Sequence, residues 1–196
     1  PACISLRQDV RGEVFDYPEE CFKERVHIIR RPKPDDFQIK EAAELIKKSK
    51  KPIIIAGGGV LYSDATDELS EFAKKHNIPV TQTVMGYSSL IKDHSHYLGA
   101  IGGLGSKAAN NLSKETDTAI AIGTKLADFT TGSWANFENP DFKLVSINAA
   151  RFDANKHMAQ AVVGDAKVSL IELSQALGSW KAEDSWYKKS RVELKD

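Results

Sequence analysis

Residues 51–60 read KPIIIAGGGV, and this stretch constrains the fold more than any other part of the sequence. The apolar run at its centre does not alternate with polar residues, which is typical of a strand buried on both faces in a parallel sheet. Three glycines follow the run, and glycine is favoured where a chain turns tightly or approaches another group closely. The glycines would make room for a nucleotide, for a neighbouring backbone or for neither, and the question stays open at this point.

Similar short apolar runs alternate with stretches of helical periodicity from residue 37 onward. We expect strands at five places: residues 52–57, 78–84, 118–123, 142–148 and 160–164. We expect the helices between and after them to have N-terminal caps at Ser63 or Asp64, at Ser106 and at Asp165. Strands that alternate with helices need crossover connections, and these give parallel sheets. The sequence therefore predicts an α/β fold: a doubly wound, Rossmann-like parallel sheet of five to six strands with helices on both faces.

Composition divides the chain into three parts. Residues 1–36 begin with an apolar stretch, ACISL, that we interpret as a strand at the end of a preceding domain, followed by a linker rich in charge and proline. Residues 37–178 hold the predicted central Rossmann-like domain. Residues 179–196 are polar and predict a connecting helix or linker toward a further domain. Because the chain starts at Pro1 without an initiator methionine, we expect it to be a piece of a longer protein.

The overall charge is balanced, since 27 lysines and arginines oppose 27 aspartates and glutamates. A neutral chain gives no electrostatic reason to expect nucleic acid or an anionic membrane as a partner. The longest apolar stretch is far shorter than the roughly 20 residues that span a bilayer, and no signal peptide is visible. Cys3 and Cys21 have no metal-like spacing, and Cys3 lies in the apolar stretch, so we expect a buried thiol and a cytoplasmic protein.

The glycines after the first predicted strand match the dinucleotide-binding fingerprint only in part. Gly57 and Gly59 fit its first two glycines, but Tyr62 stands at the third. Residues 79–81 read PVT where an acidic residue would hold the ribose hydroxyl. The sequence therefore argues against ordinary NAD binding. It favours a turn that lets a helix approach the sheet, and contact with another nucleotide or a phosphate remains as the alternative.

Three further motifs have ordinary structural explanations. GAIGGLGSK, residues 99–107, has serine and lysine in the wrong order for a P-loop, so a plain turn is favoured over anion binding at a helix N-terminus. DHSH, residues 93–96, lacks the ligands that would complete a zinc site, and a solvated loop is favoured. VVGDAK, residues 162–167, departs from the Gly-Asp-Gly magnesium motif and is explained by a strand end and a helix cap.

A polar cluster near residue 130 is the most unusual group of side chains in the sequence. It comprises Asp128, Thr130, Thr131, Ser133 and Trp134. Trp134 could stack on a ring and Lys125 could meet a phosphate, but an interface with a neighbouring domain or subunit is favoured. No Ser-His-Asp set, Cys-His pair or carboxylate pair has a catalytic spacing. We therefore predict no catalytic residue and no metal ligand in this chain.

Six stretches of the chain resemble, in the same order, the middle domain of thiamine-diphosphate-dependent enzymes of the acetolactate synthase type. They are GGGV, IPVTQTVMG, DHSHYLGAIG, GSKAANN, DTAIAIGTKLADFTTG and FKLVSINAARFDANKH. The resemblance extends from Pro1 to about Leu177. The first 31 residues and DFTTGSW, residues 128–134, resemble one branch of that family, the hydrolases that open a cyclic diketone in inositol breakdown.

The resemblance implies a carbon–carbon bond hydrolase that uses thiamine diphosphate and Mg²⁺. In full-length members, the cofactor lies between a pyrimidine-binding domain, which supplies an activating glutamate, and a diphosphate-binding domain with a Gly-Asp-Gly magnesium motif. The chain contains no Gly-Asp-Gly, and we expect both of these domains to lie outside it. The flanking domains are therefore the expected partners, a homo-oligomer is the expected assembly, and the isolated chain is expected to be inactive.

In flavin-binding members of the family, the middle domain holds FAD along these same loops. The residues that match form a candidate crevice: Gly57, Gly58, Gly59, Met85, Gly86, Gly123 and Thr124. Asn148 stands where many members have an acid, and residues 149–151 also depart from the family's pattern, so we do not expect FAD here. We expect the crevice to seat a helix and to face neighbouring domains. The alternatives are an FAD- or ADP-binding module and a structural or oligomerisation domain.

Overall fold

The computed structural model describes residues 3–194, and the contacts within the chain form two units, divided between Arg30 and Arg31. The first unit is an exposed chain with two short 3₁₀ turns, η1 (Val10–Gly12) and η2 (Glu19–Phe22). The prediction of a strand at residues 2–6 is wrong for residues 3–6, and Ala2 lies outside the described residues. The prediction of a buried thiol at Cys3 is also wrong, because Cys3 is exposed. An unpaired strand leaves its backbone groups without partners, and no described segment pairs with this one.

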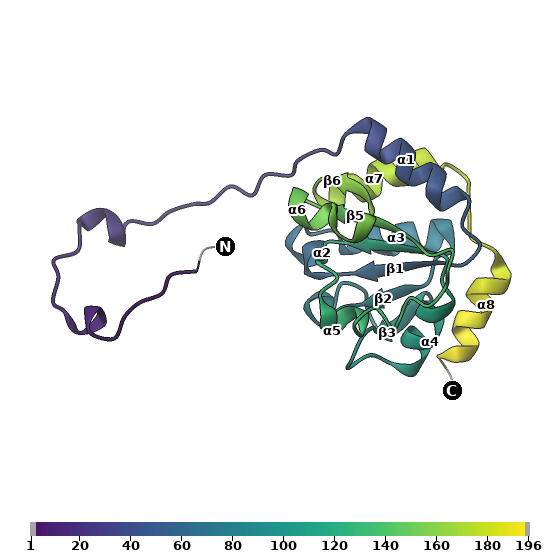
Figure 1. Cartoon of the computed structure of the whole chain (residues 1–196). Helices are drawn as coiled ribbons and strands as arrows, with labels where there is room; N and C mark the ends of the chain where they lie inside the picture. Colours follow the sequence, from purple (N-terminus) through teal and green to yellow (C-terminus); the bar gives the residue numbers. More distant parts are fainter. Residues whose placement is uncertain (1–2, 195–196) are drawn as a thin grey trace. The chain divides into compact units, whose positions relative to one another are not determined.

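The second unit contains a sheet of six parallel strands (Figure 1). The strands are β1 (Pro52–Ala56), β2 (Val80–Gln82), β3 (Tyr97–Ala100), β4 (Thr118–Ile122), β5 (Lys143–Asn148) and β6 (Gln160–Val163). Their order across the sheet is β3-β2-β1-β4-β5-β6, so the chain extends the sheet from β1 in one direction and then from β4 in the other. This order confirms the predicted doubly wound α/β fold.

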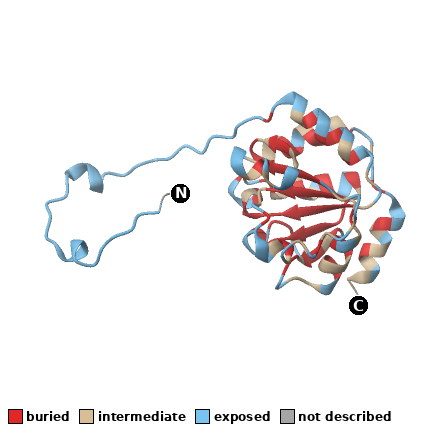
Figure 2. Ribbon diagram, in the orientation of Figure 1, coloured by how far each residue is buried: buried red, intermediate tan, exposed pale blue. Residues whose placement is uncertain are grey.

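Helices cover both faces of this sheet (Figure 1). They are α1 (Asp36–Lys47), α2 (Gly58–Tyr62), α3 (Thr66–His76), α4 (Lys107–Glu115), α5 (Asp128–Thr131), α6 (Arg151–Ala154), α7 (Ala166–Leu177) and α8 (Asp184–Glu193). Helices α1, α2, α3 and α7 pack against the face that carries Ile54 and Ile120, whereas α4 and α8 pack against the face that carries Ile53 and Ala121. Figure 2 shows the resulting buried sheet, as the non-alternating apolar runs predict.

Two of the three predicted helix caps are confirmed. Ser106 and Asp165 each accept a hydrogen bond from a backbone N–H in the first turn of α4 and α7, respectively. The cap predicted at Ser63 or Asp64 is wrong, because α3 begins after Ala65, which makes no side-chain cap. The glycines continue directly into the short helix α2, so Ser63 instead follows the end of that helix.

Strand β3 is absent from the five strands that the sequence pattern predicts. It is four residues long and contains Gly99, whose φ of +97° lies in a region that favours glycine. It pairs only with β2 and forms one edge of the sheet, with an irregular register between Val80 and Gln82. A short, glycine-interrupted edge strand has little of the apolar pattern by which strands are recognised.

Residues 179–194 pass from one face of the sheet to the other: Trp180 and Ala182 pack on the face that carries Ile54, and Trp186 packs on the face that carries Ile53. Trp186 of α8 is buried, and its Nε1–H donates to the carbonyl of Pro52 at 2.8 Å. The domain boundaries expected at residues 36 and 178 stay predictions. No helix in residues 3–194 is both long enough and apolar enough to cross a membrane.

Candidate functional site

The carboxyl ends of β1, β2 and β4 bring the seven residues of the candidate crevice together. The Gly57 N–H donates to the carbonyl of Ile122 (2.8 Å), and the Gly59 N–H donates to the carbonyl of Gly123 (2.9 Å). The turn that follows β2, η3 (Val84–Gly86), lies against the other side of the glycine turn. Because parallel strands end at the same edge of a sheet, three turns that are far apart in sequence meet here.

Four glycines of the crevice, Gly57, Gly59, Gly86 and Gly123, are packed so closely that a side chain would collide with the neighbouring backbone. A Cβ atom added at Gly59 would lie 2.5 Å from the Cα atom of Gly123. A Cβ atom at Gly57 would strike the carbonyl oxygen of Gly123, and one at Gly86 would strike that of Ala56, both at less than 3.0 Å. Real Cβ atoms essentially never approach so closely, so these glycines make room for the adjacent main chain.

These contacts occupy the space between the three turns. Two of the N–H groups in residues 57–59 already donate to protein carbonyls. The side-chain amide of Asn148 donates to the carbonyl of Thr124 (3.2 Å), which ties the turn after β4 to the end of β5. We call the seven residues the glycine junction, because main chain packs directly on main chain there.

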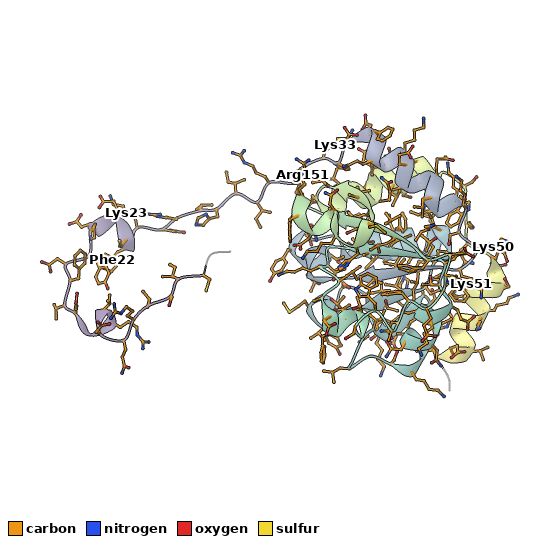
Figure 3. All side chains as sticks on the ribbon, in the orientation of Figure 1. Phe22, Lys23, Lys33, Lys50, Lys51 and Arg151 are labelled. Atoms are coloured by element: carbon orange, nitrogen blue, oxygen red, sulfur yellow. The ribbon has the colours of Figure 1, made fainter. Side chains whose placement is uncertain are left out.

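Large apolar side chains are exposed on the loops and short helices around the glycine junction. The exposed fraction is 70% for Met85, 59% for Phe129 and 78% for Phe152. Figure 3 shows Arg151, next to Phe152 in sequence, at the carboxyl edge, with Lys51 at the opposite edge. We call this set the apolar rim: Val84, Met85, Tyr87, Leu104, Phe129 and Phe152. Groups of exposed apolar side chains mark surfaces that contact other protein.

The glycine-rich loop after β3 uses its amide groups within the protein. The Gly102 N–H donates to Oδ1 of Asn110 (3.0 Å), and the Gly103 N–H donates to the carbonyl of Phe129 (3.0 Å). Ser106, at the end of the loop, caps α4. The loop is therefore a turn that is hydrogen-bonded to α4 and α5, and few of its N–H groups are left for an anion.

The polar cluster near residue 130 is partly buried. Thr131 is fully buried, and its Oγ1 accepts from the Trp134 N–H at 3.3 Å. The ring of Trp134 lies 4.4 Å from the ring of His157 and packs against the core of its own domain. Asp128 and Ser133 are exposed. The interface expected at this cluster stays a prediction, whereas Trp134 is engaged within the domain.

The solvated loop expected at residues 93–96 is wrong for its two histidines. His94 and His96 are only 6% and 7% exposed. Nε2 of His94 lies 3.1 Å from Oγ of Ser70 in α3, and the ring of His96 lies 4.6 Å from that of Tyr187 in α8. The sequence pattern misses this burial because α8, which covers His96, is distant in sequence.

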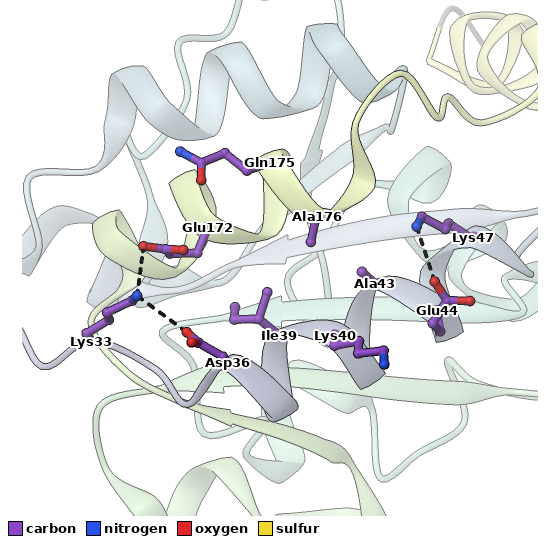
Figure 4. A pocket seen from close by; sticks show the side chains of 10 residues that line it. All are labelled: Lys33, Asp36, Ile39, Lys40, Ala43, Glu44, Lys47, Glu172, Gln175 and Ala176. Carbon is purple, nitrogen blue, oxygen red and sulfur yellow. Dashed lines mark hydrogen bonds and ion pairs between the residues drawn. The ribbon is translucent and has the colours of Figure 1, made fainter.

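An open groove of about 490 Å³ lies between α1 and α7 (Figure 4). Nζ of Lys33 lies 3.3 Å from a carboxylate oxygen of Asp36 and 3.5 Å from one of Glu172. Nζ of Lys47 lies 3.2 Å from a carboxylate oxygen of Glu44. Most of the charges in the groove therefore neutralise one another, and the groove has no set of converging groups that would select a ligand.

The described residues do not fit the thiamine diphosphate and Mg²⁺ that the resemblance implies. Within residues 3–194, no three histidine, cysteine, aspartate or glutamate side chains gather as a metal site would require. The glycine junction offers main chain that is already hydrogen-bonded rather than a cradle for a diphosphate. No catalytic step can be assigned to this chain through that cofactor.

Comparison with known proteins places these features in one family. The model of the family described as "Thiamine pyrophosphate enzyme, central domain" matches residues 39–173. This range covers most of the second unit, including the glycine junction and all six strands.

Several bacterial relatives share the sequence along nearly its whole length. A protein of Clostridium perfringens strain 13 is 44% identical over 94% of this chain, and one of Clostridium botulinum strain Alaska E43 is 45% identical over 99%. Both are named 3D-(3,5/4)-trihydroxycyclohexane-1,2-dione hydrolase, as is a Bacillus cereus AH820 protein that is 44% identical over 98%. The alignments cover 29–30% of these relatives, so the chain spans about three tenths of their length. From the family match, the chain belongs to the central-domain family of thiamine pyrophosphate enzymes.

Proposed function

We propose that this chain is the middle domain of a hydrolase that cleaves a carbon–carbon bond in a trihydroxycyclohexanedione. One observation carries the proposal: the similarity to relatives with that name reaches 99% of the chain, beyond the residues 39–173 that the family model matches. The extra similarity includes residues that precede the central domain, which a shared Rossmann-like fold alone would not require.

In this proposal, the flanking parts of a longer protein hold thiamine diphosphate and Mg²⁺. Residues 1–36 lead from a pyrimidine-binding domain, and residues 179–196 lead toward a diphosphate-binding domain. The middle domain sets the spacing between them and supplies no catalytic group. We place the apolar rim against these neighbours, because covering each exposed Met, Leu or Phe side chain is worth about 1.5–3 kcal/mol.

We also propose that the glycine junction seats α2 on the sheet and does not hold FAD, NAD or ADP. The support is the main-chain packing of Gly57 and Gly59 on Gly123. Titration of the chain with the three nucleotides tests this role. Binding in the micromolar range by any of them would overturn it. A cytoplasmic homo-oligomer completes the proposal: the balanced charge removes net repulsion between copies of the chain, and the two free cysteines suit a reducing compartment.

An exchange of domains tests the proposed activity. The segment of the Clostridium perfringens hydrolase that aligns with this chain is replaced by this chain, and hydrolysis of the dione is measured with thiamine diphosphate and Mg²⁺. We expect an active chimera. The matched control carries the corresponding segment of the Clostridium botulinum hydrolase in the same place.

The control chimera distinguishes a badly joined segment from a wrong assignment of function. If the control chimera is active and the test chimera assembles and binds the cofactor equally well without turning over the dione, the proposal is wrong. The 196-residue chain alone should be inactive under the same conditions. Turnover by that chain would show that catalytic groups lie within it.

A further inference from the structure

The segment between α7 and the end of α8, residues 179–193, is fastened to the domain by contacts with three elements: α3, α4 and β1. We call it the C-terminal arm. The amide of Asn77, at the end of α3, donates to the carbonyl of Ala182 (3.2 Å) and to Oδ1 of Asp184 (3.1 Å). The hydroxyl of Tyr187 donates to the carbonyl of Ser95 (3.2 Å). Trp186 is buried against β1, so the arm is part of the packed domain.

Two buried histidines, His76 and His96, lie at this attachment, and a third buried histidine, His94, contacts His96. Nδ1 of His76 lies 2.8 Å from the carbonyl of Trp180 and must donate to it, since a carbonyl only accepts. Nε2 of His96 lies 3.2 Å from Oδ1 of Asn77, whose amide group holds the arm. The ring of His96 also packs on Tyr187 of the arm, with centroids 4.6 Å apart.

Their hydrogen bonds suit neutral rings. Nδ1 of His94 accepts the backbone N–H of His96 at 3.1 Å, so that nitrogen must be unprotonated. Nε2 of His76 faces Oγ of Ser174 (3.1 Å), and this oxygen already accepts from the ammonium group of Lys75 (2.9 Å). The serine hydrogen is therefore free to point at the unprotonated Nε2 of His76. Protonation would replace an acceptor by a donor at both sites.

The charged groups around these rings disfavour added positive charge. Burial lowers the pKa of all three histidines, and it lowers the pKa of His96 to about 4. Basic groups from every packed element add to this effect: Lys74 and Lys75 of α3, His94 before β3 once it is protonated, and Lys181 and Arg191 of the arm. The one acidic group of the arm that reaches the cluster, Asp184, is bound to Asn77 rather than to a ring.

We propose that these three histidines make the attachment of the C-terminal arm acid-sensitive, so that the arm is docked when the rings are neutral and is released when they are protonated. A ring whose pKa is lower in the docked state than in the free state binds protons better after release. Docking is therefore complete above about pH 6.5 and weakens as the pH falls toward 4. For His96 alone, a pKa of about 4 when docked, against an ordinary 6.5 as the upper limit after release, raises the ratio of released to docked arm by at most about 100-fold between pH 7 and pH 4.

Release of the arm would uncover the edge strand β3. Nη1 of Arg191 donates to the carbonyl of Tyr97 (3.2 Å), in addition to the bond from Tyr187 to Ser95. The carbonyl of His96 accepts from the Val80 N–H (2.8 Å) and so faces β2, whereas that of Tyr97, the next residue, faces the edge with which no described strand pairs. An uncovered edge strand pairs readily with other chains, so release should promote association at acid pH.

Fluorine NMR of the chain with 5-fluorotryptophan tests the proposal. The protein contains three tryptophans, of which Trp180 and Trp186 lie in the arm and Trp134 lies elsewhere in the domain. Between pH 7.5 and pH 4, we expect the signals of Trp180 and Trp186 to move together to exposed positions, whereas that of Trp134, which touches His157, stays short of the exposed position. Movement of all three signals to exposed positions, or an unchanged Trp186 at pH 4, would overturn the proposal.

Variants and ring titrations separate the histidines from a general effect of acid. His96→Gln keeps a donor toward Asn77 without the titration, so its arm should be released at lower pH than in the wild type. His27→Gln, at an exposed histidine of the first unit, is the matched control and should leave the midpoint unchanged. Release of the H96Q arm at the wild-type pH contradicts the proposal. Should H96Q fail to fold, NMR titration of the wild-type rings decides, because a docked His96 with a pKa of 6.5 or above excludes the mechanism.

Discussion

Replacing Gly59 by alanine tests whether the glycine junction makes room for main chain. The new Cβ atom would lie 2.5 Å from Cα of Gly123, and no side-chain rotation relieves a collision with backbone. Moving α2 away from the turn after β4 should cost about 3 kcal/mol, the upper part of the usual range for overpacked sites. Alanine gains about 1 kcal/mol over glycine inside a helix. The expected net loss is about 2 kcal/mol of unfolding free energy.

Urea unfolding followed by far-UV circular dichroism measures this loss, and the melting temperature should fall by about 4–8 °C for a domain of this size. Two other glycines serve as controls. At Gly103 the nearest atoms to a Cβ belong to the Phe129 ring at 3.4 Å, so G103A should change stability by less than about 0.5 kcal/mol. Gly132 has a φ of +58° and no atom nearer than 3.6 Å, so G132A isolates the cost of left-handed backbone, about 1 kcal/mol.

Two results for Gly59→Ala would refute this reasoning. If G59A is as stable as the wild type, α2 does not need the close approach to Gly123. If G59A keeps its stability but abolishes stabilisation of the protein by an added nucleotide, the space at Gly59 belongs to a ligand rather than to main chain. After either result, it would again be open whether Gly57, Gly58 and Gly59 make room for main chain or for a ligand.

Two further substitutions test contacts at the opposite edge of the sheet. Asp117→Ala should lower the unfolding free energy by about 1–3 kcal/mol, because it leaves the N–H groups of Lys50 (2.8 Å) and Lys51 (3.1 Å) without their carboxylate acceptor. The midpoint of urea unfolding measures this loss of free energy. Asp117→Asn keeps one side-chain oxygen and should lose less stability than Asp117→Ala. Equal losses would contradict the role of Asp117 as the acceptor for these N–H groups. Trp186→Ala should weaken docking of α8 by about 3–5 kcal/mol. Trp186→Phe, which loses chiefly the hydrogen bond to Pro52, should weaken docking of α8 by about 1 kcal/mol. Hydrogen exchange of the α8 amides measures docking, and unchanged protection in W186A would show that Trp186 does not anchor the arm.

The sheet could be predicted from the sequence because its central strands have no other plausible environment. Ile53, Ile54 and Ile55 in β1 are each fully buried, and such a run fits only a strand covered on both faces. Strand β3 was missed because Gly99 breaks its short run and because an edge strand needs less apolar surface. The strand expected at residues 3–6 failed for the opposite reason, since an apolar run forms a strand only where another strand can pair with it.

The candidate site was predictable in its members but not in its geometry. Glycines at strand ends mark close approach, and the resemblance selected Met85, Gly86, Gly123 and Thr124 as their neighbours. What approaches them depends on the register between β1 and β4, which no local pattern encodes. The burial of His96 was likewise hidden, because its neighbour Tyr187 is brought to it only by the return of the chain after Gly178.

The glycine junction and the apolar rim lie at the same edge of the sheet, yet they make different demands on a partner. A nucleotide between Gly59 and Gly123 would have to break the hydrogen bond that joins them, and an unpaired buried N–H costs about 1–3 kcal/mol unless the ligand replaces its acceptor. It would also have to push α2 away from the turn after β4. A protein surface that covers Met85, Phe129 and Phe152 needs neither change, because these side chains already project into solvent. The same close packing that a ligand would have to break holds α2 against the turn after β4, and this favours the proposed spacer between other domains over a nucleotide-binding module.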